Sequence, residues 1–242
     1  HFQNVKTILK GNVGVQRVIS TDITNCNTIV DSIVQNYEQY NSFVIATRTE
    51  DIPFLSSLLS FLLENIKKPI FDTDEEHLSY IANIASTFNI PEICTCNNKG
   101  EVLRGCRSIL VYDDIITPNT QPISEKTTIH SDNKEPFIPR KIDPNLKINL
   151  IKTYPKMSGK DLVNLSANSD AIVIEMQEAI PTTDFIDAIQ FLIKNNVVVA
   201  VIGNGKIDKT YLKNLGVANG HDMTSSASIS KLYFLLSNIP DK

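Results

Sequence analysis

The chain has 242 residues, of which 42% are apolar and 21% are charged, and its formal net charge at neutral pH is −4. This average composition excludes a disordered protein, and no apolar run reaches the roughly 20 residues that a membrane-spanning helix needs. No stripe of lysine and arginine residues is present, so we expect neither a membrane nor nucleic acid as a direct partner.

Strand and helix patterns alternate along the first part of the chain. Short apolar runs bounded by turn residues predict strands, and apolar residues at intervals of three and four predict amphipathic helices. Asp22, Thr24 and Asn25 are candidates for the N-cap of the first helix. Such alternation with short connections indicates a parallel sheet covered by helices. The predicted strands are 6–11, 42–47, 68–73 and 92–98, and the predicted helices are 24–40, 52–66 and 75–88.

The pattern stops in a segment rich in proline and polar residues, 117–145, and then resumes. We therefore predict an α/β protein with a larger N-terminal domain at 1–120, a linker at 121–146 and a smaller C-terminal domain at 147–242. Within the second domain the predicted strands are 147–154, 170–176 and 197–203, and the predicted helices are 158–167, 182–195 and 224–238, the last with a Thr/Ser cap.

Cysteine and histidine spacing gives no sign of a metal site. Cys94 and Cys96 are two residues apart and no C-x-x-C is present, while the four histidines are scattered. We therefore expect no metal and no cofactor. Reduced thiols and the lack of a secretory signal favour the cytoplasm, with an organellar lumen such as that of the mitochondrion as the alternative.

A polar run directly after a buried strand marks a candidate site. The stretch "FVIATRTED", residues 43–51, leads from an apolar strand straight into hydroxyl and charged side chains. In open α/β sheets, ligands bind just beyond the carboxyl ends of the strands. The purely structural alternative is that Glu50 and Asp51 complement the dipole of the following helix, which contributes about 0.3–1 kcal/mol.

Four motifs, in the same order along the chain, resemble those of cytosolic type I L-asparaginases. The run "SFVIATRTEDIPFLSSLLSFLLENIKKPI" resembles that family's strand, H-G-T-D-T motif and apolar helix. The run "IPEICTCNNKGEVLRGCRS" resembles its I-P-E-V-x-x-F-F-N-N-x-L-x-R-G-N-R-T-T-K, "TYP" its Y-P-G, and "GVANGHDMTSSASISKLYFLLSN" its last helix. The resemblance implies a two-domain asparaginase-like fold, with a larger N-terminal parallel-sheet domain and a smaller C-terminal α/β domain. It also implies an amidohydrolase that cleaves the side-chain amide of asparagine.

The resemblance further implies which positions carry the chemistry, and several hold unsuitable residues. Anchoring on "GVQ" puts Asn12 where the family has its nucleophilic threonine. Thr49 keeps the threonine of a Thr–Asp–Lys relay, Glu50 replaces the aspartate, and Leu110 stands at the lysine. Ser20 falls on the serine that holds the substrate's α-carboxylate. A leucine can neither donate nor accept a proton, and an asparagine amide is no activated hydroxyl.

Other departures concern the surroundings of the site. Arg48 replaces a glycine and is expected to fill or reshape the pocket, and Ala179 stands near the position of an asparagine that the family lends to a neighbouring subunit. The family's lid, which carries a tyrosine, is deleted between "GVQ" and "STDIT". Closure and water exclusion are lost with such a lid.

These departures predict a catalytically inactive family member that serves as a structural or interaction subunit of a homo-oligomer, at least a homodimer, or of a larger assembly. Catalytic parts that act as a unit fail together when one is lost. Two alternatives stay open. One is an amidohydrolase that uses other residues, Thr49 or Thr47 with Glu50. The other is a binding module that keeps a pocket for a small amino acid at Ser20 and Thr49.

Overall fold

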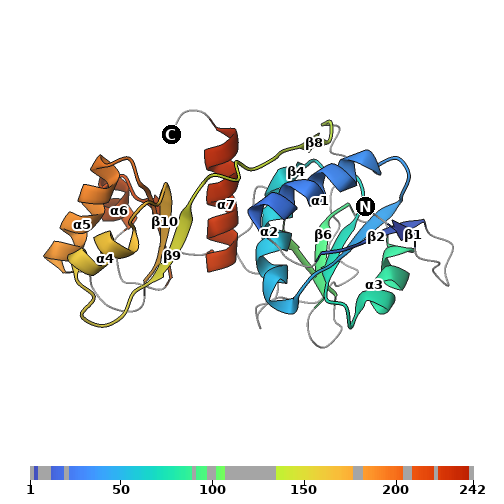
Figure 1. Ribbon diagram of the computed structural model, residues 1–242, viewed down its shortest axis with the longest axis horizontal. Helices are drawn as coiled ribbons and strands as arrows, with labels where there is room; N and C mark the ends of the chain where they lie inside the picture. The colour runs from blue at the N-terminus through green and yellow to red at the C-terminus, as the bar shows by residue number, and fades with distance from the viewer. Residues whose placement is uncertain are drawn as a thin grey trace. The chain divides into compact units, whose positions relative to one another are not determined.

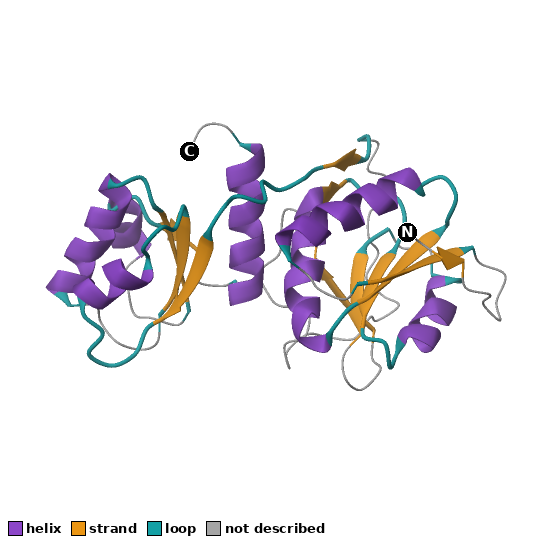
Figure 2. Cartoon of the chain, in the orientation of Figure 1, coloured by secondary structure: helices purple, strands orange, loops and turns teal. Residues whose placement is uncertain are grey.

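A computed structural model of the chain describes residues 3–4, 12–18, 22–88, 91–96, 102–106, 135–176, 182–203, 209–220 and 223–239. The chain divides into two units, each with its own sheet (Figures 1 and 2). Unit 1 comprises His1–Pro144 and Phe234–Lys242, and unit 2 comprises Asn145–Tyr233. The predicted α/β class is confirmed.

The sheet of unit 1 has six strands in the order β1-β2-β3-β5-β6-β7. The strands β2, β3, β5 and β6 run parallel, whereas β1 and β7 pair antiparallel at the two edges. Their bounds are β1 Gln3–Asn4, β2 Val13–Arg17, β3 Ser42–Ala46, β5 Ile70–Thr73, β6 Ile93–Cys96 and β7 Val102–Cys106. The central strands are short apolar runs covered on both faces, as parallel strands usually are.

Helices cover the two faces of this sheet. On one face Val15, Val44 and Phe71 pack against Leu78 and Ile81 of helix α3 (Leu78–Ala85). Successive strand residues point to opposite faces, so the neighbour of Phe71, Asp72, points to the other one. There it meets Ser56 of helix α2 (Ile52–Leu62), which in turn contacts helix α1 (Ile23–Gln35).

Two predicted caps are present. The Asp22 side chain accepts a hydrogen bond of 2.8 Å from the backbone N–H of Asn25 and is the N-cap of α1, so neither Thr24 nor Asn25 has that role. Thr224 accepts from the backbone N–H of Ala227 at the start of helix α7 (Ser225–Asn238). Both side chains satisfy a helix N–H that lacks an intrahelical partner.

The predicted domain limits differ from the observed division in two places. Residues 135–144 belong to unit 1 rather than to a separate linker, because strand β8 (Ile138–Pro139) pairs with β4 (Leu63–Glu64) and Ile142 exchanges hydrogen bonds with Asn27. The end of α7 from Phe234 also belongs to unit 1, where the Phe234 ring stacks on Phe61. The greater part of the predicted linker, residues 121–134, lies outside the described residues.

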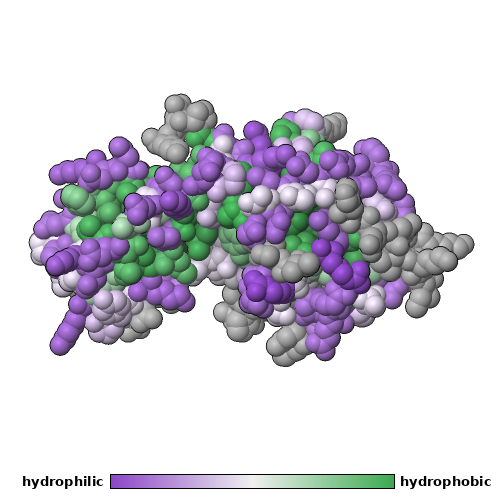
Figure 3. All heavy atoms as spheres, viewed as in Figure 1, coloured by the Kyte–Doolittle hydropathy of each residue, from purple (hydrophilic) through white to green (hydrophobic). Residues whose placement is uncertain are grey.

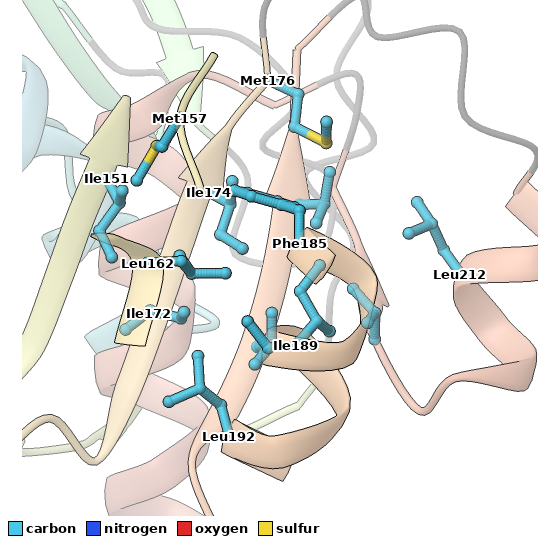
Figure 4. Packing of buried hydrophobic residues seen from close by; sticks show 14 residues of the cluster. Ile151, Met157, Leu162, Ile172, Ile174, Met176, Phe185, Ile189, Leu192 and Leu212 are labelled. Atoms are coloured by element: carbon cyan, nitrogen blue, oxygen red, sulfur yellow. The ribbon is translucent and has the colours of Figure 1, made fainter. Parts of the chain in front are cut away.

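Unit 2 has a four-stranded parallel sheet in the order β12-β11-β10-β9. Phe185, Ile189 and Leu192 of helix α5 pack onto Ile172 and Ile174 of β10 (Figure 4). The bounds are β9 Ile148–Lys152, α4 Gly159–Leu165, β10 Ala171–Glu175, α5 Thr183–Lys194, β11 Val198–Ile202, α6 Lys209–Asn214 and β12 Ala218–Asn219.

Helix α4 begins with a capping box, and this box gives a first prediction. The Ser158 hydroxyl accepts from the Asp161 N–H at 3.2 Å, and the Asp161 carboxylate accepts from the Ser158 N–H at 3.0 Å. Ser158→Ala is expected to lower the free energy of unfolding by about 1 kcal/mol, because it leaves a helix donor without its acceptor. Urea denaturation followed by circular dichroism measures this, with the exposed α3 serine variant Ser79→Ala as the control. Equal midpoints for the two variants would contradict the prediction.

Candidate active site

The carboxyl ends of three parallel strands in unit 1 lie side by side. Arg17 of β2 pairs with Ala46 of β3, and Ala46 pairs with Thr73 of β5. The backbone N–H of Thr47 donates to the Thr73 carbonyl at 2.8 Å, which keeps the two following segments together. These segments, 47–51 and 74–77, carry hydroxyl, carboxylate, guanidinium and imidazole groups.

Glu50 does not contact Thr49 as a relay would require. Its carboxylate lies 3.4 Å from the guanidinium of Arg48, and its side chain is 67% exposed. Arg48 is also exposed and forms a shorter ion pair of 2.7 Å with Asp51, at the start of α2. The guanidinium of Arg48 is thus held by two acidic residues of its own turn, and the expectation that Arg48 fills or reshapes the pocket stays a prediction from sequence.

The hydroxyl of Thr49 instead faces a carboxylate from the neighbouring strand end. Thr49 Oγ1 lies 3.5 Å from Oδ2 of Asp74. The other oxygen of Asp74 is 2.8 Å from Nδ1 of His77 and accepts from the His77 backbone N–H at 2.9 Å. Thr49, Asp74 and His77 thus form one continuous chain of polar contacts, although sequence motifs point to Glu50.

The surroundings keep Asp74 ionised. Partial burial raises the pKa of this carboxyl, but hydrogen bonds from the His77 backbone and ring and from Thr49 outweigh burial, so the pKa is lowered below its usual value. The Asp74 and His77 side chains are only 15% and 18% exposed. Beside them, Arg17 binds both carboxylate oxygens of Glu75, at 2.9 and 3.1 Å.

Two other potential nucleophiles near this edge are unsuited to the task. Thr47 is buried, and its hydroxyl has no hydrogen-bond partner among the described residues. Burial, together with the charges of Asp22, Asp72 and Asp51, raises the pKa of the Cys26 thiol to about 12. A thiol that remains protonated is a poor nucleophile.

Asn12 lies at the wrong end of the sheet for the role assigned to it. It precedes β2, its carbonyl accepts from the Asn41 N–H, and its side-chain amide donates to the Gln39 carbonyl. Since β2 has five residues at about 3.3 Å each, Asn12 lies roughly 17 Å from the edge that carries Thr49. The sequence anchor that placed Asn12 at the nucleophile is therefore wrong, and Asn12 says nothing about a lost hydroxyl.

Several predicted positions fall outside the described residues. Ser20, Leu110 and Ala179 are among them, so their relation to Thr49 stays a prediction from sequence. Sequence reasoning missed Asp74 and His77, which follow β5 in the run "TDEEH", residues 73–77.

Neither a cluster of metal ligands nor a membrane-spanning helix is present in the described part of the chain. No group of three or more acidic, histidine or cysteine residues there is arranged to hold a metal ion. No helix in that part is long and apolar enough to cross a membrane.

Comparison with known proteins finds relatives along most of the chain. This chain is 27% identical to an L-asparaginase of Dirofilaria immitis over 85% of its own length, and 24% identical to L-asparaginase 1 of Escherichia coli K12 over 90% of its own length. It is also 23% identical to a 60 kDa lysophospholipase of Mus musculus over 88%. The chain spans 41% of the Dirofilaria protein, 44% of the mouse protein and 75% of the Escherichia coli protein. No family model matches the chain.

Solved structures show the same fold. L-asparaginase I of Vibrio cholerae matches 91% of this chain and 76% of its own, with a TM-score of 0.74 at 21% identity. The thermostable L-asparaginase of Thermococcus kodakarensis matches 91% of this chain and 77% of its own, with a TM-score of 0.68 at 18% identity. The sequence relatives and the shared two-domain fold agree: over most of its length the chain is similar to L-asparaginases in sequence and in fold.

Proposed function

We propose that the chain is an amidohydrolase of the L-asparaginase type, which releases ammonia from the side-chain amide of a small amino acid. The observation that carries the proposal is the contact between the Thr49 hydroxyl and the Asp74 carboxylate at the carboxyl edge of a parallel sheet. Acyl transfer to a hydroxyl requires such a group beside a proton acceptor. Relatives named L-asparaginase over most of the chain support the same chemistry.

The test is ammonia release by the purified full-length protein from asparagine, with glutamine as the comparison substrate. The proposal expects release well above the buffer rate that saturates with substrate. Release at the buffer rate from a folded protein would overturn it.

The second candidate is a catalytically inactive structural or interaction subunit, and one observation favours it. Arg48 forms ion pairs with both Glu50 and Asp51 within a single turn, so the acid in the family's relay position is engaged elsewhere. An inactive scaffold predicts no ammonia release and no thermal shift with ligand. A module that only binds a small amino acid predicts a rise in melting temperature with millimolar aspartate or asparagine, again without release.

We further propose that the protein is at least a homodimer in the cytoplasm. Two apolar side chains on the helices of unit 2, Leu165 and Phe191, are about half exposed, at 52% and 51%, and apolar atoms are visible at the surface of this unit in Figure 3. Exposed apolar patches commonly mark sites of protein association. Light scattering at micromolar concentration is expected to give twice the monomer mass, and a monomer for the variant with Leu165→Ser and Phe191→Ser. A monomeric wild-type protein would contradict the prediction.

A further inference from the structure

The contacts around Asp74 arrange three side chains in a fixed order. A hydroxyl and an imidazole approach opposite oxygens of one carboxylate, with Thr49 Oγ1 at 3.5 Å from Oδ2 and His77 Nδ1 at 2.8 Å from Oδ1. Thr49 follows β3 and Asp74 follows β5, and these strands are paired neighbours. We infer that Thr49, Asp74 and His77 form the catalytic relay of this chain, in which Asp74 takes the proton of the Thr49 hydroxyl and His77 holds Asp74 in position.

This inference rests on the proposed amide hydrolysis and assigns its steps to atoms. Thr49 Oγ1 forms a bond with the amide carbonyl carbon, and its proton passes to Asp74 Oδ2. That proton is then delivered to the amide nitrogen, the carbon–nitrogen bond breaks, and ammonia leaves. Water attacks the resulting ester, one water proton returns by way of Asp74 to Thr49 Oγ1, and the carboxylic acid is released. The sum is amide plus water giving acid plus ammonia.

A structural role alone does not account for the imidazole. The turn before α3 is held by the bond from the His77 backbone N–H to Asp74 Oδ1, at 2.9 Å, and that bond needs no particular side chain. The ring adds a second contact to the same oxygen. With Nδ1 donating to a carboxylate, the ring orientation and tautomer of a histidine are fixed. Asp74 is therefore held from one side while its other oxygen faces Thr49.

The alternative acid, Glu50, lacks this support. It is 67% exposed and paired with an exposed guanidinium. An exposed ion pair holds its members only weakly, because water and salt compete for both charges. Asp74, by contrast, is mostly covered and contacts the Thr49 hydroxyl and the His77 ring in addition to the His77 backbone. Preorganised groups are the ones that stabilise a transition state.

Four variants of the full-length protein test the relay by ammonia release across about pH 5 to about pH 9. Asp74→Asn is expected to lower kcat by about 10²–10⁴-fold, as the loss of a proton-transfer group does. His77→Ala is expected to lower kcat more than it raises KM, and His77→Gln, which keeps a donor toward Asp74, to recover part of kcat without the pH dependence of an imidazole. The matched control is Glu76→Gln, an exposed acid in the same turn, which should stay within about twofold of wild type.

A second readout separates failure of the relay from failure of the proposed function. Folded protein is treated with p-nitrophenyl acetate, and acetylated residues are located by mass spectrometry. The relay expects an acetyl group on Thr49 in wild type and in Glu76→Gln, and none in Asp74→Asn. If wild type releases no ammonia but shows this pattern, the amide hydrolysis is wrong and the relay stands. The absence of both ammonia release and acetyl-Thr49 from folded wild type, or an unchanged kcat and pH profile in the Asp74 and His77 variants, would overturn the relay.

Discussion

Thr49→Ala is expected to reduce ammonia release from asparagine by at least about 10³-fold, while Thr49→Ser retains a measurable part of it. Alanine has no hydroxyl, and the Thr49 hydroxyl is the only one that contacts Asp74 among the described residues. Removing a nucleophile typically costs as much as removing the whole catalytic set, because the parts act as a unit. The expected loss therefore falls on kcat, with KM within a few-fold of wild type.

Two further variants make this result specific. Thr47→Val removes the other hydroxyl of the polar run, which is buried and has no described partner, and it is expected to leave kcat within about threefold. Glu50→Gln is expected to do the same, because the Glu50 carboxylate is exposed and paired with Arg48. If Thr47→Val abolishes release and Thr49→Ala does not, the nucleophile has been assigned to the wrong hydroxyl. If all variants equal a wild type that releases no ammonia, the inactive scaffold is the correct function.

The elements that sequence patterns predicted best are those with the longest apolar runs. The predicted strand 42–47 is observed as β3, and the predicted helix 52–66 as α2, which ends where β4 takes over at Leu63. The strands β2 and β7 were missed because each has only five residues and includes a glycine and an arginine, so no continuous apolar run marks it as a strand. Their strand structure depends on pairing with neighbours far away in sequence, which short-range periodicity does not detect.

The missed strand β2 explains the error about Asn12. Matching "GVQ" to a motif beyond a strand required the preceding residues to be that strand, whereas the structure makes "VGVQR" the strand itself. The sequence match thereby placed the site at the amino end of β2, whereas Thr49 lies at the edge formed by the carboxyl ends of the strands. An alignment error as long as one strand is enough to move a residue from one edge of a parallel sheet to the other.

The partner of Thr49 was missed for a different reason. Motif matching assigns a carboxylate by its place next to Thr49 in sequence, which selects Glu50. The hydrogen bond is decided across the sheet, where the end of β5 brings Asp74 beside the end of β3. The run "TDEEH" carries the same signal as "TRTED", a polar cluster just after a buried strand. Read together, the two runs would have predicted a shared edge with both carboxylates as candidates.

A buried carboxyl next to this site has no such role and carries a cost in stability. Asp72 lies inside β5 and is fully buried. Its Oδ2 accepts from the Ser56 hydroxyl at 2.8 Å, whereas Oδ1 has no hydrogen-bond partner among the described residues. Burial raises its pKa well above the usual carboxyl range, and the nearby Asp51 carboxylate acts in the same direction. Ionising a carboxyl that stays buried disfavours the folded state.

The sign of the pH dependence follows from this shift. Between the unfolded pKa, near 3.8, and the raised folded pKa, the folded state binds a proton at Asp72 that the unfolded state does not. The contribution of Asp72 to the free energy of unfolding is therefore fully present below the pKa of the unfolded state. It is lost as the pH rises toward the folded pKa, by up to about 1.4 kcal/mol per pH unit. Asp72→Asn has no proton to lose. The in-register residue on β6, Thr95, has a buried hydroxyl that also lacks a hydrogen-bond partner among the described residues.

Asp72→Asn is accordingly expected to be more stable than wild type at pH 8, with a difference that shrinks as the pH falls toward 4. Urea denaturation at several pH values from about 4 to about 8 measures the difference, and Glu38→Gln, an exposed acid on another element, provides the control with no such trend. A constant difference across this range would mean that Asp72 is not carried as a neutral acid in the folded protein. A variant less stable than wild type at every pH would mean that the Asp72 carboxylate is compensated inside the fold.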